Sequence, residues 1–417
     1  MMRQWESGKM KAVIGRACET GQVSDAAKLF VVDEAVKARR FHQSFQEYAP
    51  TPLVSLDGLA AMLGVKSIHV KDESFRFGLN AFKVLGGSYC IGNYVAKKLG
   101  MDVGELTYEF LVSPEVKEKL GKITFVTATD GNHGRGIAWT ANRLEQGCVV
   151  LMPKGSATER LENIRALGAE AWITDVNYDD TVRMATELAD KNGWVLVQDT
   201  AWDGYTEIPG WIMQGYMTMG SEIVEQLDGI RPTHVFLQAG VGAMAGALTG
   251  FLSDYYDGKS GDAPEDAAKD PVIVIVEPDK ADCIFKTAQA NDGMLHAVTG
   301  DLNSIMAGIC CGEACTIGWD VLKERVDGFV SMDDSIAARG MRILGNPAGN
   351  DGRVISGESG AATLGFAASL FMEPEFEALK EMLGVDENSR ILCISTEGAT
   401  DMAGYQRIVW DGWYANK

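Results

Sequence analysis

The chain has 417 residues, of which 46% are hydrophobic and 23% are charged, so it can bury a large core and divide into two domains. Its net charge of -20 repels nucleic acid and anionic membranes, which excludes both as expected partners. The N-terminus lacks the apolar segment of a secretion signal, and no apolar run approaches the ~20 residues that span a bilayer. We therefore expect a cytoplasmic protein whose eight cysteines are mostly free thiols.

Short apolar runs typical of β-strands alternate with helical patterns along most of the chain. The predicted strands are 67–71, 123–127, 148–152, 171–174, 194–197, 234–237, 272–276 and 391–395. A helix is predicted at 181–191, because Asn177 and two acidic residues before it suit the start of a helix. Strands that are apolar throughout suit parallel sheets covered on both faces. The pattern predicts an α/β protein of two domains, each an open, mostly parallel twisted sheet with helices on both faces.

Two segments interrupt this alternation. Residues 256–270 are polar and low in complexity, so we expect a mobile surface insertion there. Residues 102–121 are helical and partly charged. They could form a flap over a cleft or a plain surface insertion, and the sequence leaves both interpretations open.

Lys83 is the first candidate for chemistry. It follows Asn80-Ala81-Phe82 and precedes a helical stretch rich in small and apolar residues. Such neighbours make a charged lysine costly and lower its pKa, and the neutral amine can then attack a carbonyl carbon. A surface lysine that opens an amphipathic helix is the plainer interpretation of this segment alone.

The second candidate is residues 127–136, a glycine-rich loop that follows a predicted strand and opens a helix. Ligands in open α/β sheets bind outside the carboxyl ends of strands, and free N–H groups at a helix start can hold a carboxylate. Taken alone, Asp130 could be a helix cap and His133 a packed, hydrogen-bonded histidine.

The third candidate is residues 238–246, which also follow an apolar strand directly. Gly240, Gly242 and Gly246 allow a narrow turn with consecutive exposed N–H groups, an anion nest suited to phosphate. The segment lacks the lysine of a P-loop and the spacing of a dinucleotide fingerprint, so nucleotide binding fits poorly. Close packing of strand against helix is the alternative.

Three further motifs carry hydroxyls or a carboxylate, and two of them lie at strand ends. Residues 394–398 carry the hydroxyls of Ser395 and Thr396, which could pair with a ring nitrogen, and residues 356–361 carry Glu358. Glu277 also ends a predicted strand, and we expect it to be structural.

The cysteines do not predict a metal site. Cys310, Cys311 and Cys315 cluster, but the chain has five histidines and no paired C-x-x-C, so no zinc is expected. A disulfide from Cys283 to this cluster is conceivable, and buried reduced thiols are the simpler alternative.

In this order, from about residue 45 to the C-terminus, these motifs resemble the fold-type II family of pyridoxal-phosphate enzymes, which includes threonine deaminase, tryptophan synthase β and cysteine synthase. The resemblance implies that Lys83 forms the Schiff base with pyridoxal 5'-phosphate. It implies that Asn132 lies beside the phenolic oxygen of the cofactor and that Ser395 or Thr396 faces the pyridine nitrogen. The implied phosphate loop is Gly240, Val241, Gly242, Ala243 and Met244. The implied substrate loop is Thr129, Asp130, Gly131, Asn132 and His133.

Departures from the common family pattern indicate one branch. The usual SFKxRGA is here NAFKVLGG, Asp130 replaces the usual serine before Gly-Asn-His, and the phosphate loop has fewer glycines. The segments that resemble signatures of the diaminopropionate ammonia-lyases are 76–83, 129–136, 198–202 and 277–283. This resemblance implies α,β-elimination of 2,3-diaminopropionate, of both D and L isomers, to pyruvate and ammonia.

Two carboxylates have a chemical reason to lie near this substrate. Diaminopropionate has a second amine, which Asp130 or Asp199 could attract and orient, although Asp199 could equally be a helix cap or a hydrogen-bond hub. Two bases, Lys83 and Asp130, would let one site process both isomers. Glu358 is a further candidate for substrate binding near the edge of the cofactor.

The resemblance also implies a homodimer and a division into domains. Residues 1–87 and 207–417 would form a large cofactor-binding domain, and residues 88–206 a small domain that carries the substrate-carboxylate loop.

Two other functions stay open. One is a related eliminase that acts on serine, threonine or a cysteine derivative, although a neutral hydroxyl would gain little from Asp130. The other is a catalytically silent amino-acid-binding protein on the same fold, against which the intact Lys83, phosphate loop and Asn132 argue.

Overall fold

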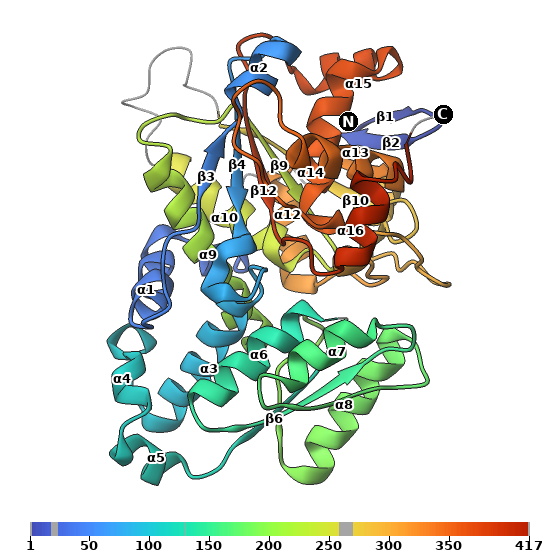
Figure 1. Cartoon of the computed structure of the whole chain (residues 1–417). Coiled ribbons are helices and arrows are strands. Elements are labelled where there is room, and N and C mark those ends of the chain that lie inside the picture. The colour runs from blue at the N-terminus through green and yellow to red at the C-terminus, as the bar shows by residue number, and fades with distance from the viewer. Residues whose placement is uncertain (1, 18–23, 130, 258–269, 416–417) are drawn as a thin grey trace. The chain divides into compact units, whose positions relative to one another are not determined.

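The computed structural model describes residues 2–17, 24–129, 131–257 and 270–415 (Figure 1). The chain divides into two compact units. The larger unit comprises Met1–Val32, Thr51–Phe75 and Glu222–Lys417, and the smaller unit comprises Asp33–Pro50 and Arg76–Ser221. Each unit is built around its own sheet.

The sheet of the larger unit has the strand order β1-β2-β11-β10-β9-β12-β4-β3 within the described residues. Its centre is parallel, and β2 and β3 pair antiparallel toward the two sides. The strands are β1 (Arg3–Glu6), β2 (Met10–Ile14), β3 (Leu53–Ser55), β4 (Ser67–Asp72), β9 (His234–Gln238), β10 (Val272–Pro278), β11 (Gly328–Met332) and β12 (Arg390–Ser395). The chain order reverses between β9 and β12, and the carboxyl ends at such a switch point are where ligands bind in open α/β sheets.

Helices and buried apolar side chains cover this sheet. Val274, Val276 and Val330 on the central strands are fully buried and belong to one apolar cluster with Phe366 and Ala367 of α14. The helices are α2 (Asp57–Leu63), α10 (Ala243–Asp257), α11 (Cys283–Ala290), α12 (Thr316–Arg325), α13 (Asp334–Gly345), α14 (Glu358–Met372), α15 (Glu377–Leu383) and α16 (Met402–Val409). Short 3-10 turns occur at η1 (Ala27–Leu29), η5 (Ala307–Ile309) and η6 (Pro374–Phe376), and η2 (Glu73–Gly78) spans a boundary between the units.

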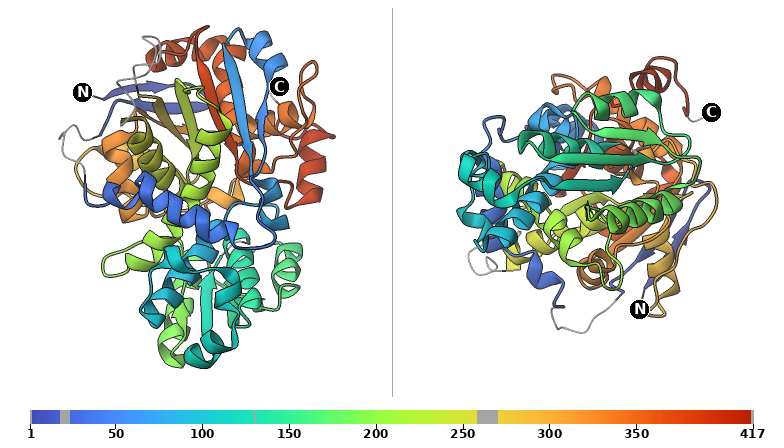
Figure 2. Two further views of the ribbon diagram at one scale, coloured as in Figure 1. Left: turned by 90° about the vertical axis from the view of Figure 1, so that its left-hand side faces the viewer. Right: turned by 90° about the horizontal axis from the view of Figure 1, so that it is seen from below.

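The sheet of the smaller unit, whose strands are drawn in teal to green in Figure 2, is parallel throughout and has the order β7-β6-β5-β8. Its strands are β5 (Thr124–Ala128), β6 (Gly147–Met152), β7 (Glu170–Ile173) and β8 (Val195–Leu196). Its helices are α1 (Val32–Gln43), α3 (Val84–Leu99), α4 (Tyr108–Leu111), α5 (Pro114–Leu120), α6 (Asn132–Arg143), α7 (Thr158–Arg165), α8 (Tyr178–Asn192) and most of α9 (Glu207–Gln226). Here the chain order reverses between β5 and β8, which is a second switch point.

The structure confirms the predicted α/β class and every predicted strand, with ends that shift by at most two residues. The strands that the sequence did not predict are β1, β2, β3 and β11. The first three lie toward the sides of the sheet and carry at most three consecutive apolar residues, and β11 contains a glycine and a serine. Within 102–121 the structure has η3 (Val103–Glu105), α4 and α5, and residues 258–269 of the expected insertion lie outside the described residues.

The domain boundaries differ from the predicted ones. Residues 76–87 and 207–221 were expected in the large domain but pack in the smaller unit, together with residues 33–50. The physical reason is close packing of α3 on α9: a Cβ added to Gly86 would lie 2.6 Å from Tyr216 Cε1.

Within the described residues, no helix combines the length and the apolar character that crossing a bilayer requires.

Candidate active site

Lys83 lies immediately before α3 in the smaller unit. Three residues earlier, Asn80 adopts a left-handed backbone conformation with a φ of 59°, which asparagine tolerates better than most residues. The chain therefore turns sharply just before the lysine, and α3 begins at Val84.

Glycines hold the start of α3 against α6. A Cβ on Gly136 would lie 2.8 Å from Val84 Cα, and a Cβ on Gly87 would lie 3.0 Å from Ile137 Cδ1. Side chains do not fit at such distances without a shift of the neighbours. The small residues that the sequence places beside Lys83 thus bring it near the helix that carries His133.

Lys83, Asp199 and His133 form a charged group, which we call the Lys83 cluster. The Lys83 ammonium makes an ion pair with Asp199 Oδ2, and the two side chains are 20% and 7% exposed. His133 Nδ1 lies 3.9 Å from the same carboxylate oxygen. His133 Nε2 lies 2.8 Å from Val197 O, and because a carbonyl only accepts, Nε2 carries a proton. These three of the predicted residues therefore lie together at the switch point between β5 and β8.

Asp199 is held in its ionised form. Burial raises the pKa of this carboxyl, but the charges of Lys83 and His133 and the hydrogen bond from Lys83 outweigh burial and bring the pKa to about 2. Asp199 is consequently an anion at neutral pH, inside a protein region that otherwise disfavours charge. Such a carboxylate can bind and orient an ammonium group.

The loop from β5 to α6 offers backbone donors. Thr129 is buried, and its Oγ1 accepts from Gly131 N at 2.9 Å. The helix begins at Asn132, so the N–H groups of its first turn have no partner within the helix and can bind a carboxylate. Asp130, the predicted second base, lies outside the described residues.

In the larger unit, the predicted phosphate loop follows β9. Gly242 has a φ of 89°, a conformation that favours glycine, and a Cβ there would lie 2.7 Å from Ile284 Cδ1. A Cβ on Gly240 would lie 3.0 Å from Ile309 Cα. Because α10 begins at Ala243, the first N–H groups of this helix have no helical acceptor. The loop is a compact nest of backbone donors without a charged side chain.

Two hydroxyls lie at the end of the neighbouring strand β12: Ser395 is its last residue and Thr396 follows it. Their contacts differ. Ser395 is fully buried and donates toward Ser356 Oγ at 2.8 Å and Glu397 O at 3.4 Å. Thr396 Oγ1 instead accepts from Gln238 Nε2 at 3.2 Å. Among the described residues none accepts from the Thr396 hydroxyl, so its proton is available for another acceptor.

Two glutamates at the carboxyl ends differ in role. Glu277 accepts the backbone N–H groups of Ile284 at 3.0 Å and Phe285 at 2.6 Å, so it caps α11, and burial raises its pKa. This geometry agrees with the structural role expected for it. Glu358 is the first residue of α14, is 7% exposed and suits the positive end of the helix. A Cβ on Gly404 would lie 2.9 Å from Glu358 Oε1.

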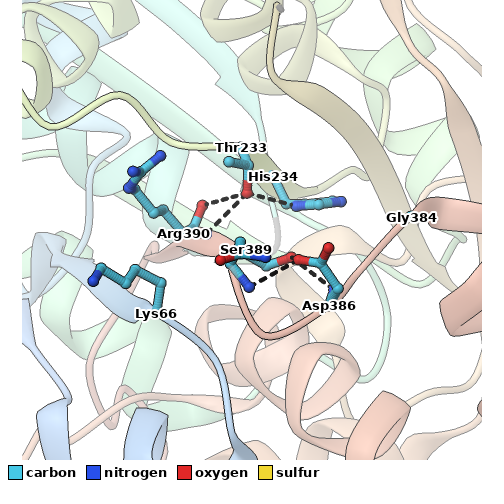
Figure 3. A pocket seen from close by; sticks show the side chains of 8 residues that line it. Lys66, Thr233, His234, Gly384, Asp386, Ser389 and Arg390 are labelled. Atoms are coloured by element: carbon cyan, nitrogen blue, oxygen red, sulfur yellow. Dashed lines mark hydrogen bonds between the residues drawn. The ribbon is translucent and has the colours of Figure 1, made fainter. Parts of the chain in front are cut away.

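A pocket of about 330 Å³ lies at the opposite edge of the larger sheet (Figure 3). It is lined by Lys66, Thr233, His234, Gly384, Asp386, Asn388, Ser389 and Arg390. These residues surround the amino ends of β4, β9 and β12, whereas the predicted phosphate loop follows the carboxyl end of β9. Thr233 Oγ1 lies 2.8 Å from His234 Nδ1, and His234 Nε2 lies 3.1 Å from Leu383 O, so both ring nitrogens are already used.

The described cysteines are all free thiols, including Cys283, Cys310, Cys311 and Cys315. Burial raises the pKa of Cys283, so this thiol is not activated. Within the described residues no group of side chains could hold a metal ion.

Sequence reasoning missed two residues that shape these edges, Gln198 and Gln238. Both are buried, and both use their side-chain amides to bond neighbouring strand ends. A signal was present, since each glutamine stands at the end of an apolar strand directly before a motif residue or loop.

Comparison with known proteins identifies the family of the chain. The model of the family described as pyridoxal-phosphate dependent enzyme matches residues 44–397. The diaminopropionate ammonia-lyase of Escherichia coli (strain K12) is 50% identical over 394 residues, which are 94% of this chain and 95% of that protein.

Solved structures give the same result. The Escherichia coli diaminopropionate ammonia-lyase in complex with D-serine has a TM-score of 0.88 and 48% identity, and the match covers 98% of both chains. The same enzyme in complex with the aminoacrylate-PLP azomethine reaction intermediate has a TM-score of 0.87 and 48% identity, and the match covers 98% of this chain and 99% of that chain. The matches cover nearly the whole chain, and the chain has the two parallel-centred sheets and the lysine before α3 described above. The chain therefore belongs to the family of pyridoxal-phosphate-dependent enzymes of fold type II.

Proposed function

We propose that this protein catalyses the pyridoxal-phosphate-dependent α,β-elimination of 2,3-diaminopropionate, D and L, to pyruvate and ammonia. The observation that carries the proposal is the Lys83 cluster, in which the amine of Lys83, the ionised carboxylate of Asp199 and the imidazole of His133 meet. A substrate with a second ammonium group suits such a carboxylate better than one with a neutral hydroxyl. A relative that is 50% identical over nearly the whole chain carries the name diaminopropionate ammonia-lyase.

The described residues fit the cofactor. Lys83 provides an amine for its aldehyde, and Gly240–Met244 provides backbone donors for its phosphate in a chain whose net charge is -20. When bound, pyridoxal phosphate supplies an electron sink for the pair left on Cα once its proton is removed. The protein must then bind the substrate, move that proton and release the β-nitrogen.

Two residues are proposed to remove the Cα proton. Lys83 Nζ would act on the L isomer and Asp130 on the D isomer, so that one site accepts both. The backbone N–H groups at the start of α6, with Thr129, Gly131 and Asn132, would hold the α-carboxylate.

Asp199 is proposed to bind the β-ammonium. Its carboxylate stays ionised, and His133 lies on its Oδ2 side with Nε2–H fixed on Val197 O. When the Cβ–N bond breaks, the bonding electrons leave with the nitrogen, which departs as ammonia. Glu358 is proposed as a further contact of the substrate. It is a buried acidic residue at the start of α14.

Of the two hydroxyls on β12, Thr396 is proposed to donate to the pyridine nitrogen. The Ser395 hydroxyl is already directed to Ser356 Oγ and Glu397 O, whereas Thr396 receives a hydrogen bond from Gln238 and keeps its own proton for an acceptor. A neutral hydroxyl donor suits an unprotonated ring nitrogen.

One observation favours a second candidate. The related Escherichia coli enzyme has a solved structure with D-serine, so elimination of serine, with water instead of ammonia as the product from Cβ, is the alternative reaction.

Pyruvate formation from D- and L-diaminopropionate, measured beside D- and L-serine, tests the proposal. We expect kcat/KM for diaminopropionate to exceed that for serine by about 10- to 100-fold, because one charge-assisted hydrogen bond is lost with serine. Equal or better turnover of serine would move the assignment to the second candidate. No pyruvate from any of the four, with no visible cofactor absorption, would favour a silent binding protein.

A cytoplasmic homodimer is also proposed. The free thiols of the described cysteines suit a reducing compartment. Light scattering at micromolar concentration that gives the mass of a single chain, 45.1 kDa, would contradict the dimer.

A further inference from the structure

Gln198 is a fully buried residue between β8 and Asp199. Its side-chain amide bonds both backbone groups of Ala128, the last residue of β5: Oε1 accepts from Ala128 N at 3.1 Å, and Nε2 donates to Ala128 O at 3.0 Å. Oε1 also accepts from Thr127 Oγ1 at 3.1 Å, and Nε2 donates to the Tyr178 hydroxyl at 2.8 Å. The amide thus uses both of its donors and both of its acceptor positions.

The two bonds to Ala128 replace two that the backbone would otherwise form. β5 and β8 pair in parallel with Val126 opposite Leu196, and Val197 N donates to Val126 O at 2.9 Å. One further step of a parallel ladder would bond Ala128 N to Val197 O, and Asp199 N to Ala128 O. The Gln198 side chain occupies both positions on Ala128 instead.

The bonds from Gln198 to Ala128 determine the orientation of His133. Because Gln198 satisfies the N–H of Ala128, Val197 O is left to accept from His133 Nε2, at 2.8 Å. The ring then presents Nδ1 toward Asp199 Oδ2, at 3.9 Å.

The same bonds from Gln198 to Ala128 determine the position of Asp199. Its backbone is released from the ladder, its Oδ2 pairs with Lys83, and its Oδ1 lies 3.5 Å from Gln198 Nε2. Because Gln198 bonds Ala128 in its place, the Asp199 carboxylate faces the amine of Lys83 and not the sheet.

We propose that Gln198 is a positioning residue of the active site: its side chain ends the β5–β8 ladder one step early and so directs Val197 O to His133 and the Asp199 carboxylate to Lys83. The inference rests on the proposed function for its activity readout, but its spectroscopic readout is independent of the substrate.

The test uses Gln198→Leu in the holoenzyme, with Tyr178→Phe as the matched control. Leucine cannot bond Ala128, whereas Tyr178→Phe removes one outer partner of the amide and keeps both bonds to Ala128. The readout is the ¹⁵N NMR spectrum of labelled histidine, which is tractable because the chain has five histidines. The His133 signals are assigned by their loss in His133→Asn.

In the unmodified protein and in Tyr178→Phe we expect His133 to carry a stable proton on Nε2. In Gln198→Leu, Val197 O returns to Ala128 N–H, so the Nε2 signal should shift or broaden. Since misplacement of a catalytic group by about 1 Å can cost about 100-fold, kcat for diaminopropionate should fall by about 10- to 100-fold at unchanged cofactor content, with a smaller change in KM. Tyr178→Phe should stay within about twofold.

A His133 proton on Nδ1 alone in the unmodified protein would overturn the proposal even if Gln198→Leu does not fold. Unchanged His133 signals in a folded Gln198→Leu variant would overturn it as well. If the unmodified enzyme does not turn over diaminopropionate but the His133 signals respond as expected, the proposed substrate fails and the positioning role stands.

Discussion

The β5–β8 switch point of the smaller unit is charged, whereas the proposed phosphate loop at the β9–β12 switch point of the larger unit is built from backbone donors. At the first, Lys83, Asp199 and His133 meet, and the ionised Asp199 has a pKa of about 2. At the second, the Gly240–Met244 loop and Thr396 offer N–H and O–H donors and no charged side chain. We propose that the same topology serves two chemistries: movement of protons at the first edge and binding of the phosphate and ring of the cofactor at the second.

This contrast has a physical reason. Groups that accept and return protons must change charge, so they need partners that tune their pKa values. A group that holds phosphate through backbone donors keeps the same charge throughout, so it needs rigid geometry, which glycine packing supplies. Substitutions at the first edge should accordingly lower turnover, and substitutions at the second should weaken cofactor binding.

The largest effect is expected from Lys83→Ala. No amine remains to hold the cofactor covalently or to remove a proton, so turnover of both isomers should fall by at least about 10⁴-fold. The measurement is steady-state pyruvate formation, with the visible spectrum as a check on bound cofactor. Near-normal turnover would remove Lys83 from its proposed role.

Asp130→Asn should lower turnover of the D isomer more than turnover of the L isomer. The amide is nearly isosteric but cannot take a proton at neutral pH, so turnover of the D isomer should fall by about 10²- to 10⁴-fold and that of the L isomer by less. The ratio of kcat values for D and L reports this directly. Equal, small losses with normal cofactor absorbance would leave Asp130 as a helix cap and shift the search for the second base to Asp199.

Thr396→Val and Ser395→Ala form a matched pair at the β9–β12 edge. Loss of the donor to the ring nitrogen should lower kcat of Thr396→Val by about 10- to 100-fold and change the cofactor absorption, since a buried hydrogen bond is lost. Ser395→Ala should stay within a fewfold, because that hydroxyl is directed to Ser356 and Glu397. The opposite order of effects would exchange the two assignments.

The smallest effect concerns acid stability at the charged edge. The folded pKa of Asp199, about 2, lies below its ordinary value of 3.8, so its ion pair stabilises the fold above pH 3.8, and this contribution is lost as the pH falls through 2. A shift of this size corresponds to about 2 kcal/mol. The difference in unfolding free energy between the unmodified protein and Asp199→Asn should be constant near pH 6 and shrink below pH 4. A difference that stays constant down to pH 3 would argue against the pair.

The sequence predicted more of the fold than of the site geometry. Apolar runs such as 272–276 predict their strands because both faces of a parallel strand are buried, whereas β1–β3 carry no such run. The domain boundaries were missed because Gly86, which looks like part of a cofactor motif, also packs α3 against α9.

Within the site, residue type predicted candidates but not contacts. Glycines before a helix predict the nest at Gly240–Met244, because backbone freedom is local. The choice between Ser395 and Thr396 depends on Gln238, which is more than 150 residues away along the chain. The contribution of Gln198 depends on where a strand ladder ends, and no local pattern shows that.

One pair of variants tests the division between the two edges most directly. Gly242→Asp places a carboxylate and a Cβ in the nest, and the control Gly229→Asp is made at a glycine with a similar φ of 87° and open space around it. The dissociation constant of pyridoxal phosphate and kcat at saturating cofactor are measured for both, and for Asp130→Asn.

We expect Gly242→Asp to weaken cofactor binding by at least about 100-fold, through like-charge repulsion and steric collision, and to regain kcat to within about threefold once the cofactor is saturating. Asp130→Asn should show the reverse, with normal cofactor affinity and lost turnover of the D isomer, and Gly229→Asp should change neither quantity. Unchanged pyridoxal-phosphate affinity in Gly242→Asp would contradict the central claim.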